Sequence, residues 1–316
     1  MIDVSIIIVN WNVADLLAAC LDSILSSAVS LDETSDDVPV IEIIVVDSAS
    51  TDNSVPMLRE QYPMVRLFAE DENVGFVRGN NIGFMAAQGR YHFLLNPDTE
   101  VQQNTIKKMI EYLDSNPTIA IAGPHTLNTD GTHQSTRRRF PTVPLAFFES
   151  TWAESLTPQH IRNQFKVLDL PNDGTYEVDW VQGSAILARR DVYETIGGLD
   201  TNFVMFFEET DWCKRAKDAG FLVAYIGDAV ITHHGGQSSG QVVAQKHQYY
   251  QESKLRYYHK HFNRLIAEIL RVYLLAHYLF QLILESAKAL LGSKRDMRHE
   301  RIKVYSQILR RGLKVS

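Results

Sequence analysis

The stretch Val4-Ser5-Ile6-Ile7-Ile8-Val9 begins the pattern that decides the fold. This β-branched run predicts a buried strand, and a second run, Ile41-Glu42-Ile43-Ile44-Val45-Val46, predicts another. Between them, apolar residues recur at helical spacing from Leu16 to Leu25. A strand, a helix and a second strand in this order are typical of a mostly parallel sheet that is covered by helices on both faces.

The same alternation continues along the chain. Further strands are expected at 65–68, 91–95, 119–122, 178–187 and 222–226, and further helices at about 76–88, 104–114, 189–196 and 207–219. Residues 126–178 lack a clear period and are expected to form loops. The fold class predicted is therefore α/β, with a C-terminal helical extension after about residue 240.

Composition limits the classes of protein to which the chain can belong. Its 316 residues are 45% apolar and 22% charged, enough to bury a core. Cys20 and Cys213 cannot form a disulfide framework, and no zinc-binding spacing is present. With no secretory signal recognisable at residues 1–12, we expect a reduced, cytoplasmic setting.

Charge is unevenly distributed along the chain. The net charge is −7, yet residues 286–316 contain nine Lys or Arg against Asp296 and Glu300. An acidic body is a poor nucleic-acid binder, so no nucleic-acid partner is expected. The basic tail fits either an anionic membrane surface on the cytoplasmic side or a solvated helical face.

Residues 264–291 form a long segment without Pro or Gly, and a single helix is predicted there. Its longest uncharged run, Val272 to Leu284, is too short for a spanning helix, which needs about 20 residues. Two interpretations stay open: an amphipathic helix in the membrane interface, or a helix packed on the catalytic domain or in a homo-oligomer interface.

Two acidic sites carry the chemistry. Asp98 follows the apolar run Tyr91 to Leu95 through Asn96-Pro97, at the carboxyl end of an expected strand, where ligands bind in open α/β sheets. Glu208, Glu209 and Asp211 lie in a cluster flanked by large apolar residues. One carboxylate that holds a metal and another that takes a proton would suffice for a transferase acting on a phosphorylated donor. A GxGxxG fingerprint is missing after the first strand, which argues against a dinucleotide-binding enzyme.

These blocks resemble glycosyltransferase family 2, in order and at sensible spacing over about residues 3–240. The resemblance to the family and its rhamnosyltransferase-like branch rests on residues 4–12, 45–54, 72–76, 79–83, 95–98, 178–185, 196–200, 206–215 and 233–238. It implies a GT-A fold, a nucleotide-diphosphate-sugar donor, a divalent cation and inversion at the anomeric carbon.

The resemblance also implies roles for individual residues. The nucleotide would contact Val9, Asn10, Asn12, Asp47, Asn73, Gly75 and Asn80. Asp98 would ligate Mg²⁺ or Mn²⁺ with His233, although His234 could exchange with its neighbour, and Asn96 replaces the first acidic residue of the family's metal motif. Asp179, Trp180, Gly183 and Ser184 would form a floor for the sugar or acceptor.

The catalytic base departs from the family pattern, which usually has Glu-Asp where this chain has Glu208-Glu209. Glu209 is the predicted base, with Glu208 and Asp211 as alternatives; Asp211 also fits a carboxylate that is stabilised by the helix dipole. Arg137, Arg138 and Arg139 either grip an acceptor phosphate or are solvated loop charges.

The function expected is that of an inverting, metal-assisted glycosyltransferase. Residues 1–240 are expected to form the catalytic domain, with about 1–125 binding the nucleotide and 126–240 binding the acceptor. Residues 241–316 are expected to form a basic helical region that could associate with a membrane. The branch suggests a donor such as dTDP-rhamnose, and the acceptor is expected to be a polyprenyl-diphosphate-linked sugar or a growing polysaccharide. A non-catalytic nucleotide-sugar binding protein is the alternative, and a nucleotidyltransferase is disfavoured because the Gly-rich, basic loop it needs is missing.

Overall fold

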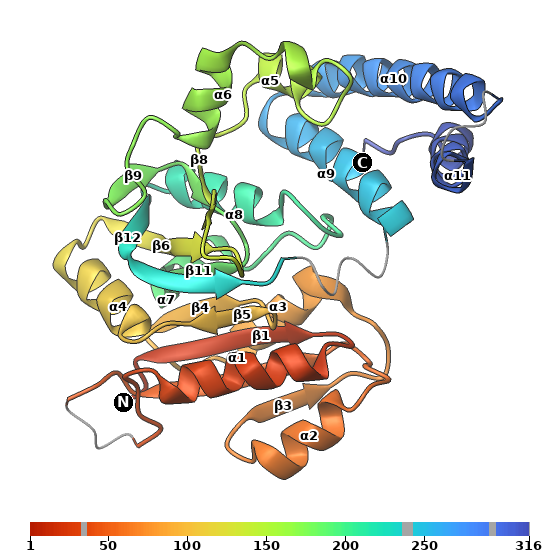
Figure 1. Cartoon of the computed structure of the whole chain (residues 1–316). Helices are drawn as coiled ribbons and strands as arrows, with labels where there is room; N and C mark the ends of the chain where they lie inside the picture. The colour runs from red at the N-terminus through yellow and green to blue at the C-terminus, as the bar shows by residue number, and fades with distance from the viewer. Residues whose placement is uncertain (33–36, 236–242, 291–294, 316) are drawn as a thin grey trace. The chain divides into compact units, whose positions relative to one another are not determined.

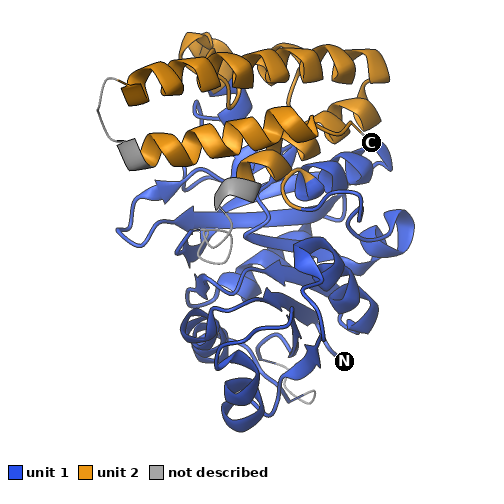
Figure 2. Cartoon of the chain, turned by 90° about the vertical axis from the view of Figure 1, so that its right-hand side faces the viewer, with its two compact units in different colours: residues 1–140, 163–204, 208–241 blue, residues 141–162, 205–207, 242–316 orange. Residues whose placement is uncertain are grey.

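A ten-stranded mixed sheet forms the centre of the first of two compact units (Figures 1 and 2). The computed structural model describes residues 1–32, 37–235, 243–290 and 295–315. The first unit comprises residues 1–140, 163–204 and 208–241, and the second comprises residues 141–162, 205–207 and 242–316. The boundary predicted at residue 240 falls within 236–242, outside the described residues.

The strands are β1 (Val4–Asn10), β2 (Ile41–Asp47), β3 (Arg66–Ala69), β4 (Tyr91–Leu95), β5 (Thr99–Val101), β6 (Ile119–Leu127), β7 (His133–Gln134), β8 (Arg137–Arg138), β9 (Tyr176–Val178), β10 (Trp180–Val181), β11 (Ala185–Arg189) and β12 (Leu222–His233). The helices are α1 (Ala14–Ser26), α2 (Ser54–Gln61), α3 (Gly75–Ala86), α4 (Thr105–Ser115), α5 (Val143–Phe148), the 3₁₀ turn η1 (Glu154–Leu156), α6 (Gln159–Lys166), α7 (Arg190–Ile196), α8 (Glu208–Asp218), α9 (Val243–His261), α10 (Arg264–Leu290) and α11 (Arg295–Arg311).

Two apolar layers cover the sheet, as the alternation of strands and helices predicts. Ile6 and Ile8 of β1 face a cluster that includes α1, α2 and α4, whereas Ile7 faces a cluster that includes α3, α7 and α8. Side chains alternate across a strand, so one β-branched run supplies both faces. Gly83 lets α3 approach closely, because a Cβ there would lie 2.2 Å from Ile7 Cγ2.

The order of strands along the main path is β3-β2-β1-β4-β11-β6-β12-β5. The first four are parallel, with Asn10 opposite Asp47 and Ile7 opposite Leu94. β11 runs antiparallel to β4, so its first residue, Ala185, pairs with the last residue of β4, Leu95. β6 is antiparallel to β11, and β12 is parallel to β6, so β12 ends in the same direction as β4. One edge of the sheet, here called the carboxyl edge, therefore gathers Asn10, Asp47, Leu95, Ala185 and His233.

The single strand expected over 178–187 is wrong: this stretch forms the end of β9, then β10 and the start of β11. Each piece has a different partner, because β9 pairs with β12, β10 with β8, and β11 with β4 and β6. The chain turns at Asp179, and again at 182–184. Periodicity alone cannot distinguish one strand from three that follow each other directly.

The interval 126–178 is also more ordered than predicted, since it contains β7, β8, α5, η1 and α6. β12 extends beyond 226 to His233, and β5 was not predicted; α9 and α11, whose bounds were not predicted, lie in the helical region expected after about residue 240. The helix expected from Phe207 begins at Glu208, because Phe206 and Phe207 both have left-handed φ angles, 69° and 64°.

Candidate active site

The first part of the site is the pair formed by Asn10 and Asp47, which end adjacent parallel strands at the carboxyl edge. Asn10 Nδ2 donates to Asp47 Oδ2 at 2.8 Å, and the Ser50 N–H donates to Asp47 Oδ1 at 2.8 Å. Both side chains are buried, and Asn10 Oδ1 has no hydrogen-bond partner among the described residues. The carboxylate thus closes the turn after β2, while a buried amide oxygen is left for another donor.

The loops beside this pair are held by local hydrogen bonds. The Asn12 N–H donates to Ser50 Oγ at 2.9 Å, and the Thr51 N–H donates to Asn12 Oδ1 at 2.7 Å. Asn12 and Ala49 have φ angles of 53° and 57°, uncommon for residues other than glycine. Such conformations persist only where the surroundings impose them, and they cluster at ligand sites.

Asn73 and Gly75 join this region through Ser48, which directly follows β2. The Gly75 N–H donates both to Asn73 Oδ1 at 2.9 Å and to Ser48 Oγ at 3.1 Å. Asn80, by contrast, is buried in α3 and donates to Phe76 O of its own helix. Asn80 was predicted to contact the nucleotide, but its side-chain N–H donates within its own helix.

Asp98 and His233 meet at the carboxyl edge because β5 pairs with the end of β12. Asp98 Oδ1 lies 3.2 Å from His233 Nε2, and both side chains are buried. The His234 side chain points elsewhere, because its Nε2 lies 2.6 Å from Glu100 Oε1. The backbone N–H of His234 donates to the Asp98 carbonyl. The structure therefore places His233, and not His234, against the Asp98 side chain.

Gln134 orients the His233 ring. His233 Nδ1 lies 2.7 Å from Gln134 Oε1, so the Nδ1–H donates to this oxygen. Nε2 of the neutral ring then presents a lone pair to a carboxylate oxygen, and two acceptors this close require a proton or a cation between them. Carboxylate and neutral imidazole are both ligands for Mn²⁺, and carboxylate suits Mg²⁺.

A divalent cation fits this pair with few protein ligands. Among the described residues no group of three or more His, Cys, Asp or Glu side chains could enclose a metal. Asn96 Oδ1 is buried without a hydrogen-bond partner among them, two residues before Asp98. Mg²⁺ in phosphate sites usually keeps several waters and phosphate oxygens as ligands, so a sparse protein donor set matches that use.

Gly183 and Ser184 connect the Asp98 loop to Glu209. The Asn96 N–H donates to the Ser184 carbonyl at 2.9 Å, and the Gly183 N–H donates to the Glu209 carboxylate. A Cβ on Gly183 would lie 3.7 Å from Glu209 Oε1, which confirms how closely the two approach. The loop between β10 and β11 thus lies close both to Asn96, two residues before Asp98, and to Glu209, the predicted base at the start of α8.

Glu208 and Glu209 differ in their surroundings although they are adjacent. Burial raises the pKa of Glu208 well above its usual value, and the Glu209 charge raises it further. Burial also raises the pKa of Glu209, but backbone N–H groups, including those of Gly183 and Thr210, and the Arg138 charge oppose that rise. When the pair holds one proton, Glu208 therefore keeps it and Glu209 carries the charge.

Asp211 serves the packing of α8. It is fully buried and accepts from Arg215 Nε at 2.8 Å, while the other guanidinium nitrogens donate to the carbonyls of Ile196 and Gly198 at 2.7 Å. These contacts fix α8 to the end of α7. Of the three carboxylates considered as a base, Asp211 is the one neutralised by an arginine.

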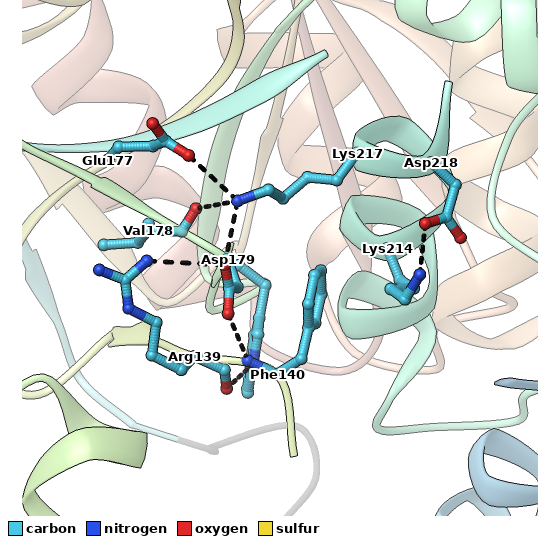
Figure 3. A network of polar contacts seen from close by, with 9 residues as sticks. Arg139, Phe140, Glu177, Val178, Asp179, Lys214, Lys217 and Asp218 are labelled. Carbon is cyan, nitrogen blue, oxygen red and sulfur yellow. Dashed lines mark hydrogen bonds and ion pairs between the residues drawn. The ribbon is translucent and has the colours of Figure 1, made fainter. Parts of the chain in front are cut away.

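Asp179 lies in a network of ion pairs and hydrogen bonds (Figure 3). Its Oδ1 lies 3.0 Å from Lys217 Nζ and 3.5 Å from Arg139 Nη1, and its Oδ2 accepts from the Phe140 N–H at 2.9 Å. The carboxylate therefore ties the 139–140 segment to α8. Trp180, next along the chain, is half-buried, packs against the core and donates from Nε1 to the Arg139 carbonyl at 3.0 Å.

The three consecutive arginines have separate surroundings. Arg137 is only 1% exposed and donates to the carbonyls of Val167, Leu170 and Pro171, so it is neither a solvated charge nor a phosphate grip. Arg139 pairs with Asp179. Arg138 lies opposite Trp180 in the β8–β10 pair, and its charge acts on Glu209.

Sequence reasoning missed Gln134, Ser48 and Ser50. A two-residue strand such as β7 has too little length for a period, so no sequence signal marks Gln134 as the partner of a histidine 99 residues away. Ser48 and Ser50 lie in the block 45–54, where the resemblance implied a role for Asp47 alone. Both cysteines are buried, and burial raises each thiol pKa to about 12, which leaves them unreactive.

Comparison with known proteins places these features in a family. The sequence model of glycosyl transferase family 2 matches residues 5–196, more than half of the chain. An N-acetylglucosaminyl-diphospho-decaprenol L-rhamnosyltransferase of Mycobacterium tuberculosis is 24% identical over 217 residues, which are 64% of this chain and 69% of that protein. A dTDP-rhamnosyl transferase of Shigella flexneri, RfbF, is 22% identical over 203 residues, covering 63% and 62%.

Solved structures agree on the architecture. The mannosyltransferase PcManGT from Pyrobaculum calidifontis, in complex with GDP-Man and Mn²⁺, superposes with a TM-score of 0.55 at 17% identity, over 97% of this chain and 86% of that one. Residues 1–349 of TarS from S. aureus give a TM-score of 0.52 at 15% identity, over 98% and 90%. The fold is therefore GT-A, as predicted.

Proposed function

The chain belongs to glycosyl transferase family 2, and from that premise we propose that it moves a sugar from a nucleotide diphosphate to an acceptor hydroxyl with inversion. The observation that carries the proposal is the arrangement at the carboxyl edge. There, the Asp98–His233 pair and the Glu209 carboxylate are joined through the short segment 182–184 and the Asn96 N–H. A transferase of this kind needs those two groups beside one donor.

The donor end of the site is assigned to the Asn10–Asp47 pair and the loops beside it. The unpartnered Asn10 Oδ1, the constrained turns at Asn12 and Ala49, and the Gly75 N–H supply polar contacts for a nucleotide. Val9, at the end of β1, supplies backbone next to them. Trp180, Gly183 and Ser184 are our candidates for contact with the sugar or acceptor, and Asp179 would act there by positioning Trp180.

Asp98 and His233 would hold Mg²⁺ or Mn²⁺, with Gln134 fixing the ring that presents Nε2. The cation, when bound, would neutralise charge on the diphosphate leaving group. Asp98 and Asn96 would orient the diphosphate end of the donor, while Arg138 and the Gly183 N–H oppose the rise that burial causes in the pKa of Glu209.

Glu209 would take the proton of the incoming hydroxyl as the oxygen attacks the anomeric carbon. A single displacement of this kind breaks the bond to the diphosphate on the opposite face, which is why inversion is expected. The raised pKa of Glu209 brings it closer to neutral pH, where a base is most effective. Glu208 would stay protonated and leave the charge to its neighbour.

The donor that we propose is an activated deoxyhexose such as dTDP-rhamnose, because two of the relatives carry rhamnosyltransferase names. The acceptor proposed is a polyprenyl-diphosphate-linked sugar or a growing polysaccharide. An acceptor held in a lipid bilayer suggests a peripheral location on the cytoplasmic face of the membrane.

Release of nucleoside diphosphate tests the proposal directly. Purified protein would be incubated with a panel of nucleotide sugars and Mg²⁺ or Mn²⁺, with a membrane-lipid extract as acceptor, with and without EDTA. One donor should turn over, and EDTA should stop it. Glu209→Gln should lower kcat by about 100-fold or more, the usual contribution of a general base, and Asp98→Ala should also lose turnover.

Glu194→Gln is the matched control, because Glu194 is an exposed carboxylate in α7, paired with Arg190. Its activity should equal that of the wild type. Tight donor binding without turnover for any acceptor would instead indicate a nucleotide-sugar binding protein. Full activity in Glu209→Gln would show that another group is the base.

A further inference from the structure

One side of α10 is apolar and exposed along its whole length. The side chains concerned are Leu265, Ile269, Val272, Leu279, Phe280, Ile283 and Leu290, with exposed fractions between 50% and 85%. They recur mainly at intervals of three, four and seven residues, so they lie on one side of the helix, together with the exposed Ala276 and Ala287. We call these residues the apolar face. At 1.5 Å per residue, the 27-residue helix is about 40 Å long.

The opposite side of α10 is buried within the second unit, where α9 and α11 pack against it. Leu270, Leu274 and Tyr278 are almost completely buried there. The same side contains polar groups with partners: Glu285 pairs with Arg298 of α11 at 2.8 Å, and His277 Nδ1 accepts from the Trp152 N–H at 3.3 Å. α10 therefore has one side that is packed against protein and an apolar side that stays largely exposed among the described residues.

Among the described residues, α10 is the helix that is long and apolar enough to cross a membrane by length and composition alone, with a mean hydropathy of 1.4 in its best window. Its neighbours argue for a different placement. A spanning α10 would carry the Glu285–Arg298 pair and the polar helices α9 and α11 into hydrocarbon, where charged groups are costly. A helix lying along the interface exposes only its apolar face to lipid.

A cavity with two arginines and one carboxylate in its lining lies beside the amino-terminal end of this face, and Arg271 Nε pairs there with Glu268 Oε2 at 2.8 Å. The cavity has a volume of about 420 Å³ and is lined by His259, Arg264, Arg271, Glu268, Leu313 and Val315. Arg264 directly precedes Leu265, the first residue of the apolar face. Leu313 and Val315 flank the exposed Lys314, which brings the end of the basic C-terminal segment to the same place. Arginine is well suited to binding phosphate groups.

We propose that the apolar face docks on an anionic phospholipid bilayer, with the cavity at Arg264 and Arg271 taking a lipid phosphate. The assignment deepens the peripheral location proposed above and rests on that location, not on the identity of the sugar. Apolar area and basic charge act together in such binding.

Flotation with lipid vesicles tests the proposal on the full chain, without donor or acceptor. The wild type should bind vesicles that contain phosphatidylglycerol more tightly than vesicles of phosphatidylcholine alone. Val272→Glu with Ile283→Glu, two exposed positions, should weaken binding to both by about 100-fold. Arg264→Gln with Arg271→Gln should weaken binding to the anionic vesicles by about 30-fold, on the basis of two basic residues near the surface.

Met85→Glu is the matched control, because Met85 is 71% exposed in the first unit. It should bind vesicles as the wild type does, and circular dichroism should give the same helix content for all variants. Binding that is unchanged in the Val272–Ile283 variant would overturn the assignment, as would a wild type that ignores vesicles but forms a dimer lost in that variant. Resistance of the bound chain to alkaline extraction would mean that α10 spans the bilayer. Turnover of a soluble acceptor, measured separately, distinguishes failure of docking from failure of the proposed activity.

Discussion

Glu208 and Glu209 show how two neighbouring carboxylates acquire different roles. Both are in the first turn of α8, where the helix dipole favours negative charge. Only Glu209 also receives the N–H of Gly183 and the field of Arg138. The difference in pKa between the two carboxyl groups therefore arises from Arg138 in β8 and from Gly183 in the loop after β10, which act on Glu209.

The raised pKa of Glu208 predicts that the free energy of unfolding depends on pH through this group. Because the folded-state pKa is raised, the stability linked to this group is fully present below the unfolded pKa and is lost as pH rises through the folded value. Glu208→Gln mimics the protonated form at every pH. Its free energy of unfolding should match that of the wild type at about pH 4 and exceed it at about pH 8, because the carboxyl group of the unfolded chain loses its proton at a lower pH than that of the folded chain.

Urea denaturation at several pH values would measure this difference. Glu194→Gln, at an exposed position, should show no such pH dependence. If the Glu208→Gln effect were the same at both pH values, Glu208 would not be the proton holder of the pair.

Gln134 offers a second prediction at the scale of one residue. Gln134→Ala removes the acceptor that fixes the His233 ring, so the affinity for Mn²⁺ should fall by about 10- to 100-fold. Isothermal titration with Mn²⁺ and a nucleoside diphosphate would measure the change. Gln103→Ala is the control, since the Gln103 side chain donates to the Ser26 carbonyl and touches no predicted ligand. Unchanged Mn²⁺ affinity in Gln134→Ala would show that the ring needs no such partner.

At the scale of elements, a buried ion pair within α8, between Asp211 and Arg215, holds the guanidinium that is hydrogen-bonded to carbonyls at the end of α7. Arg215 connects Asp211 to two carbonyls, and Trp212 Nε1 donates to the Gly197 carbonyl at 2.9 Å. Asp211→Ala should lower the free energy of unfolding by about 3–5 kcal/mol, because it leaves a partly buried guanidinium without its carboxylate. Thermal and urea unfolding would measure the loss.

The exposed pair of Arg190 and Glu194 in α7 provides the comparison, since Glu194→Ala should cost about 0.5 kcal/mol or less. Equal losses in Asp211→Ala and Glu194→Ala would mean that burial does not distinguish the two pairs. Asp211→Ala protein that remains folded should keep its base and turn over, whereas Glu209→Gln should not.

At the scale of the molecule, the carboxyl edge gathers segments from residue 9 to residue 233 into the site that we propose. A ligand that binds there only in the folded state stabilises the chain by mass action. A nucleoside diphosphate with Mn²⁺, at about 100 times its Kd, should raise the free energy of unfolding by about 2.7 kcal/mol. Calorimetry would measure it. Asp98→Ala should lose the Mn²⁺-dependent part, and Asp228→Ala, an exposed carboxylate, should keep it. Equal stabilisation in both variants would exclude Asp98 as a metal ligand.

Much of the fold follows from the sequence because burial leaves a local period. The runs at β1, β2 and β4, and the helices α1, α3 and α4, were predicted to within a few residues. The family could also be predicted from the order of residues, because many short blocks occur at the spacing of glycosyl transferase family 2. The strands and helices depend on residues that are close along the chain, and the family depends on sequence blocks that can be compared directly with those of known proteins.

Which side chains come into contact depends on the tertiary structure and could not be predicted from the local sequence. The tertiary structure divided 178–187 among three strands, turned His233 rather than His234 toward Asp98, placed Gln134 on that ring and buried Arg137 among carbonyls. The reason is physical: strand pairing and burial of a charge depend on partners that can be more than a hundred residues away, and a local period contains no information about them. The α/β alternation, the family and the candidate residues for the chemistry can be read from the sequence, whereas the partners of those residues depend on the fold.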